Sequence, residues 1–117
     1  MRSLLAASAA SLALAAAHSG PLITSSQAAH AMTAQIHRQT EARLRGGYHG
    51  RTSCSGEGGS EGTFNPTTEL PRWHCTLELG GARFPRPCRA AANVFATASP
   101  HRVRIQWLAM SRYCRAQ

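Results

Sequence analysis

The clearest alternation of apolar and polar residues in this chain runs from residue 72 to residue 79. Its apolar side chains fall on every second position, at Trp73, Cys75, Leu77 and Leu79. Because neighbouring side chains of a strand point to opposite faces, this spacing predicts a β-strand with one buried face. Gly80–Gly81 then predicts a two-residue turn into a return strand over 82–86, which would place Arg83 opposite Glu78.

A second alternation predicts a further strand over residues 102–108. Val103, Ile105 and Trp107 would point inward, and Arg102 and Arg104 would face solvent. Together these segments predict about three short antiparallel strands.

Two helices are predicted as well. The segment 28–45 is predicted to be helical because apolar or small residues recur at multiples of four. These residues are Ala28, Met32, Ile36 and Leu44. The Ala-rich segment 89–98 suits a short helix that Ser99–Pro100 would end. Strands and helices together predict a small α+β domain that covers residues 28–117.

The remaining segments have the composition of connections. Residues 18–27 contain Gly-Pro and several hydroxyl side chains, which predicts a linker, and the Gly-rich stretch 46–66 predicts a loop. Between helix and loop, the residues 43–47 spell Arg-Leu-Arg-Gly-Gly, which resembles the tail of ubiquitin-like proteins. That resemblance implies cleavage after Gly47 by a Gly-Gly-specific protease, whereas a helix C-terminus with a glycine stop explains the same residues.

The N-terminus has the layout of a signal peptide over residues 1–17. Arg2 precedes a run of Leu, Ala and Ser that closes on small residues, so cleavage is expected after Ala17, or later after Ala31. The run is too short and too rich in Ala and Ser to span a bilayer, so no transmembrane span is expected in the mature chain. The protein is therefore expected to be secreted. An acid-poor leader with Ser and Arg also fits a transit peptide for a mitochondrion or plastid.

An oxidising compartment would turn the four cysteines into disulfides. Cys54, Cys75, Cys88 and Cys114 lack the close spacing by which zinc sites pair their ligands, so neither a metal nor a cofactor is expected. Three pairings of four cysteines exist. In the predicted hairpin Cys88 is a diagonal neighbour of Cys75, which it can meet if the prolines bend the chain, so we expect Cys75 with Cys88 and Cys54 with Cys114.

The charge of the chain indicates what the domain could bind. The net charge is +8, and all 13 basic residues are Arg. Such a balance attracts anionic surfaces, nucleic acid or acidic glycans, and Arg binds phosphate and carboxylate in a bidentate manner. The predicted binding residues are those of a basic face, namely Arg83, Arg86, Arg89, Arg102 and Arg104.

The sequence also contains catalytic candidates. His74, Glu78 and His101 could exchange protons while Arg83 holds a phosphate, as in a ribonuclease. The same His and Glu side chains are ordinary on the exposed face of a hairpin.

Three functional hypotheses follow. The first is a small secreted basic protein, similar in kind to an effector or antimicrobial factor, that binds an anionic or protein partner. The second is a secreted ribonuclease or phosphodiesterase. The third rests on the Ala, Gly, Arg and Pro bias, which also characterises the product of a GC-rich reading frame without selected function.

Overall fold

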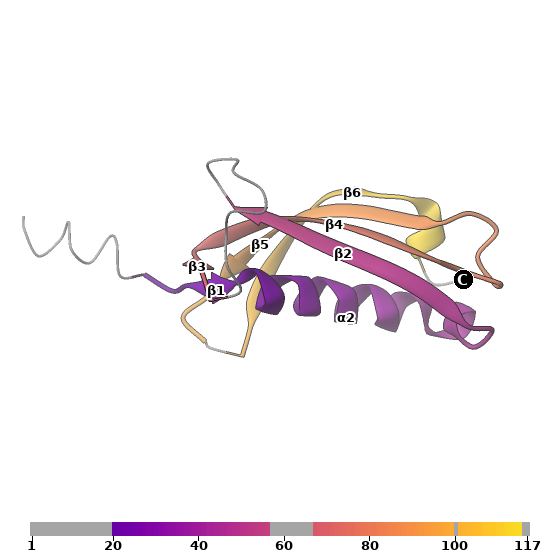
Figure 1. Cartoon of the computed structure of the whole chain (residues 1–117), viewed down its shortest axis with the longest axis horizontal. Coiled ribbons are helices and arrows are strands. Elements are labelled where there is room, and N and C mark those ends of the chain that lie inside the picture. The colour runs from indigo at the N-terminus through magenta and orange to yellow at the C-terminus, as the bar shows by residue number, and fades with distance from the viewer. Residues whose placement is uncertain (1–19, 57–66, 100, 116–117) are drawn as a thin grey trace, which may run out of the picture.

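The computed structural model describes residues 20–56, 67–99 and 101–115. Its main sheet has four antiparallel strands in the order β2–β4–β5–β6, with bounds Tyr48–Gly56, Arg72–Gly81, Cys88–Ala96 and Val103–Met110. Helix α2, Ser25–Leu44, runs along one face of this sheet (Figure 1). The expected signal peptide, residues 1–17, lies outside the described residues.

Two smaller features complete the architecture. Strands β1, Ile23–Thr24, and β3, Glu69–Leu70, form a two-stranded antiparallel sheet just before α2. A 3-10 helix, η1, spans Arg112–Cys114 after β6. The predicted α+β class, stabilised by disulfides, is thus confirmed.

Helix α2 matches the predicted stripe and begins earlier than expected. Ala28, Met32 and Ile36 are buried against the sheet. At the N-terminus, Thr24 and Gln27 form a capping box. The backbone N–H of Gln27 donates to Thr24 Oγ1 over 3.1 Å, and the backbone N–H of Thr24 donates to the side-chain Oε1 of Gln27 over 2.8 Å. The predicted linker, residues 18–27, therefore includes β1 and the first turn of α2. Cleavage of the chain after Ala31 would fall inside the helix.

The predicted helix over 89–98 is wrong, because this segment forms strand β5. Its buried side chains alternate, with Ala90, Ala92 and Val94 facing α2. Alanine favours helices in isolation, but pairing with β4 and β6 on both sides overrides this preference.

The predicted return strand over 82–86 is also wrong. Strand β4 continues through Gly81, and the 82–87 segment connects it to β5, the true return strand. The Phe84 amide donates to the Gly81 carbonyl over 3.0 Å, and the Phe84 ring turns into the core. Glu78 consequently lies opposite Arg89 rather than Arg83.

The Gly-rich segment predicted as a loop over 46–66 contains strand β2, Tyr48–Gly56, and residues 57–66 lie outside the described residues. Strand β2 is an edge strand whose outward side chains are polar, which hides its alternation. Only one polar contact ties its middle to the helix, a 2.7 Å hydrogen bond between the hydroxyls of Thr33 and Thr52, as far as the described residues show.

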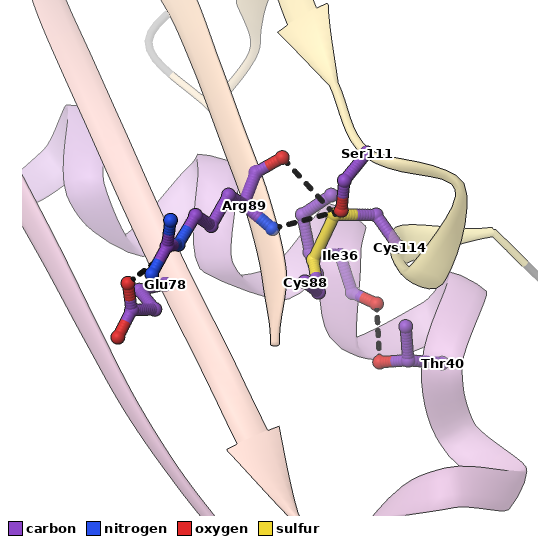
Figure 2. The surroundings of a disulfide bond; sticks show 7 residues. All are labelled: Ile36, Thr40, Glu78, Cys88, Arg89, Ser111 and Cys114. Atoms are coloured by element: carbon purple, nitrogen blue, oxygen red, sulfur yellow. Dashed lines mark hydrogen bonds and ion pairs between the residues drawn. A yellow bond between two sulfur atoms is a disulfide. The ribbon is translucent and has the colours of Figure 1, made fainter. Parts of the chain in front are cut away.

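The position of strand β2 determines which cysteines are paired. It places Cys54 directly opposite Cys75, and these two residues are bonded, while Cys88 is bonded to Cys114. The predicted pairing of Cys75 with Cys88 and of Cys54 with Cys114 is therefore wrong. The second disulfide fastens η1 to the start of β5, above Ile36 and Thr40 of α2 (Figure 2).

Gly81 is the position at which the fold has the least room for a side chain. A Cβ atom there would collide with the carbonyl oxygen of Gly47 and would lie 3.0 Å from the Cα atom of Tyr48. Both obstacles are backbone, so we expect Gly81→Ala to lower the free energy of unfolding by about 1–3 kcal/mol. Chemical denaturation would measure this loss.

Gly80→Ala is the matched control, because a Cβ at Gly80 would meet only the side chain of His49, at 3.3 Å, which can rotate away. Equal losses for the two variants would contradict the close backbone contact at Gly81.

Candidate arginine-rich binding surface

The five predicted arginines do not share one surface. Arg83 and Arg86 lie in the β4–β5 connection, Arg89 and Arg104 lie on the face of the sheet away from α2, and Arg102 precedes β6 at the opposite end of the sheet. Arg104 is paired with Phe95, six residues along β5 from Arg89. At about 3.3 Å per residue, this separates the two arginines by about 20 Å.

The outer face of the main sheet, which α2 leaves uncovered, holds an open hollow of about 690 Å³. Small side chains such as Thr76, Ala91 and Ala109 line it, together with Arg51, Glu78 and Arg89. Arg89 Nε donates to Glu78 Oε2 over 2.9 Å (Figure 2). Both side chains are well exposed, so this pair contributes little to stability.

Two of the catalytic candidates, His74 and Glu78, have separate partners on this face. His74 Nδ1 lies 3.4 Å from Asn93 Oδ1, whereas Glu78 is paired with Arg89. His74 and Glu78 are four residues apart on β4, about 13 Å, and His101 lies in the β5–β6 connection. No hydrogen bond among the described residues joins any two of the three, so the residues proposed for proton transfer are not assembled around one point.

A denser group of arginines lies at the C-terminal end of α2. Three segments meet there, the helix end, the β4–β5 connection and η1, as Figure 1 shows. We call this group the Arg-rich end, and its members are Arg43, Arg45, Arg83, Arg86, Arg112 and Arg115. The sequences that supply them, 43–45, 83–86 and 112–115, contain no acidic residue.

Specific contacts bring these segments together. The side chain of Arg83 lies across Gly46, where an added Cβ would come within 3.0 Å of Arg83 Cγ. The guanidinium of Arg43 lies over the ring of Phe84, 5.7 Å from its centroid. The Cys88–Cys114 disulfide then holds η1 beside the start of β5.

The end of α2 explains the first pair of arginines. The Gly47 amide donates to the Leu44 carbonyl over 3.1 Å, and Gly47 adopts a φ of 90°, which terminates the helix. The helix stop predicted from Gly46–Gly47 is thus present. Arg43 and Arg45 lie where the unpaired carbonyls of a helix end favour positive charge.

Tyr113 lies beside two further arginines of this end, Arg112 and Arg86. Arg112 Nη2 donates to the phenol oxygen of Tyr113 over 2.9 Å. This hydrogen bond lowers the pKa of the Tyr113 phenol, and the nearby charges of Arg112 and Arg86 add to the effect. The surroundings therefore favour the anionic form of the phenol, as expected among several guanidinium groups.

A groove of about 660 Å³ lies between the last turns of α2 and the β4–β5 connection. Four arginines and one carboxylate are among its lining residues, and these are Arg38, Arg43, Arg45, Arg83 and Glu41. Within the described residues Glu41 forms no ion pair with these arginines, so the groove has an excess of positive charge.

Part of this surface was missed by sequence reasoning. The sequence predicts Arg83 and Arg86 as binding residues and Arg43 and Arg45 as part of a helix end, and it assigns no role to Arg112 and Arg115. The repeated spacing of two arginines separated by one to two other residues, in 43–45, 83–86 and 112–115, was the available pattern.

Fold and surface together define a small α+β domain, crosslinked by two disulfides, with a basic end. Across residues 20–56, 67–99 and 101–115, no three His, Cys, Asp or Glu side chains are grouped so that they could hold a metal ion. No helix in the same ranges is both long and apolar enough to cross a membrane. The chain matches no protein-family model, no curated protein and no solved structure.

Proposed function

We propose that this protein is a secreted binding protein that attaches to a polyanion through its Arg-rich end. The observation that carries the proposal is the convergence of six arginines from three segments on one end of the domain. Five of them are exposed, and Arg43 is buried. A polymer of phosphate or sulfate groups could contact several of these guanidinium groups at once, and the resulting release of counterions favours binding.

Secretion is supported by two features of the chain. Its first 17 residues have the composition of a signal peptide. Its cysteines form disulfides, which are compatible with an oxidising compartment.

Polyanion binding is tested by neutralising Arg83, Arg86 and Arg112 together with Gln. Because three phosphate contacts would be lost, we expect the affinity for single-stranded RNA to fall about tenfold or more at low salt. The slope of log affinity against log salt should also become shallower by about 2, at about 0.7 per neutralised charge. Fluorescence anisotropy across a salt series, with RNA and then with heparin, measures both quantities.

The matched control removes three arginines elsewhere, by replacing Arg51, Arg102 and Arg104 with Gln. We expect this variant, with the same net charge, to keep most of its affinity. Equal losses in both variants would show that net charge alone is responsible, and a wild-type protein without salt-dependent affinity for either polymer would refute the proposal.

A further inference from the structure

The groove beside the last turns of α2 differs from the rest of the Arg-rich end because it contains a buried charge. Arg43 is only 9% exposed. Its one contact of note is with the ring of Phe84, and it forms no hydrogen bond or ion pair with any described residue. Buried guanidinium groups are normally paired with an anion or with several acceptors, because removing a charge from water is costly.

A second polar group in the same groove also lacks a partner. Gln39 lines the groove, and its buried Oε1 atom accepts no hydrogen bond. Unsatisfied buried groups are rare in folded proteins, and one explanation for them is a bound ion or molecule. This oxygen is an acceptor and does not pair with an anion, so the ligand is inferred from the guanidinium of Arg43, which is buried and unpaired among the described residues.

The donors around the groove indicate the shape of that ligand. Arg83 is held across Gly46 beside the ring that covers Arg43, and Arg45 lines the same groove. Three guanidinium forks can each bind a pair of oxygens. A carboxylate offers two oxygens, whereas a phosphate or sulfate group offers three or more, so a tetrahedral oxyanion can engage more of these donors at once.

We propose that this groove is a binding site for one phosphate or sulfate group, with Arg43 as its central ligand and Arg83 and Arg45 beside it. The inference rests on the proposed polyanion binding and deepens it, because it assigns one group of the polymer to a built pocket. The remaining arginines of the Arg-rich end would then contact neighbouring groups of the same polymer.

Inorganic phosphate and inorganic sulfate test the site separately, with acetate as the carboxylate comparison. Two-dimensional NMR titration of the full chain should show saturable shifts of the amides of residues 38–45 and 83–84 with phosphate or sulfate, and weaker binding of acetate. Arg43→Met keeps the aliphatic stem against Phe84 but removes the charge, and we expect it to weaken binding about tenfold or more. The anion that binds more tightly would distinguish a phosphorylated from a sulfated partner.

Arg51→Met is the matched control, because it removes the same charge from the outer face of the sheet and should leave the titration unchanged. Arg83→Met provides a second test at an exposed position, in case Arg43→Met does not fold, and it should also weaken binding. The site would be overturned if folded Arg43→Met and Arg83→Met kept the wild-type affinity for phosphate and sulfate, or if acetate bound as tightly as these anions. Either result would show that Arg43 only packs on Phe84 and the helix end. If the phosphate site is overturned but Arg43→Met still binds RNA, the polyanion proposal remains intact. A wild-type protein that shows no salt-dependent binding of RNA or heparin would refute the polyanion proposal separately.

Discussion

Replacing Trp73 with alanine should lower the free energy of unfolding by about 3–5 kcal/mol, the range for removing a buried aromatic side chain. Trp73 is 1% exposed and is among the largest fully buried side chains of the described core. Its indole Nε1 donates to the Ile23 carbonyl over 2.8 Å, which attaches β1 to the main sheet. The substitution therefore removes packing from the core and leaves a buried carbonyl without its donor. Urea denaturation followed by far-ultraviolet circular dichroism measures the loss.

Two further variants separate these contributions. Trp73→Phe keeps most of the ring and removes the donor, so we expect a smaller loss of about 1–3 kcal/mol. Leu108→Ala, at a side chain that is 52% exposed, should change stability by less than about 0.5 kcal/mol. A Trp73→Ala variant as stable as Leu108→Ala would show that Trp73 is not in the core.

Removing the Cys88–Cys114 disulfide by changing both residues to alanine should cost about 3 kcal/mol. The bond closes a loop with a sequence separation of 26, and crosslinks of that length restrict the unfolded chain by about this amount. We also expect the start of β5 and η1 to lose protection from hydrogen exchange first, because the bond joins these two elements. Denaturation and amide exchange measure the two effects.

Peptide mapping of the oxidised protein is the control for this prediction. Cleavage after arginine separates all four cysteines, so non-reducing mass spectrometry should find the peptides of Cys54 and Cys75 linked, and those of Cys88 and Cys114 linked. Peptides that join Cys75 to Cys88 would contradict the strand register as well as the disulfides.

Strands were predictable where large apolar side chains alternate with charged ones. In β4 and β6 the alternation of Trp, Leu, Ile and Val with polar residues is enough to show which face is buried. Strand β5 uses alanine on both faces, for example Ala90 and Ala91, so its pattern carries little information about burial. Its identity as a strand depends on neighbours that a local pattern does not contain.

One missed strand led to the wrong disulfides. Strand β2 is polar and contains glycine, so its sequence predicts a loop around Cys54 and does not indicate the register that brings Cys54 opposite Cys75. The proposed binding surface is equally hard to predict from the sequence. Arg83 and Arg86 are close in sequence and could be found, but their proximity to Arg43 and Arg112 depends on the helix end and on the Cys88–Cys114 bond.

The order of the cysteines along the chain has a consequence for how the protein matures. The first and second cysteines are bonded to each other, as are the third and fourth, so the two covalent loops neither cross nor enclose one another. Cys54 and Cys75, the two cysteines of the β2–β4 bond, both precede Cys88 along the chain. In each bond, the second cysteine is the next cysteine along the chain after the first. The native pairing can therefore form by joining consecutive cysteines in order, without reshuffling of an earlier bond.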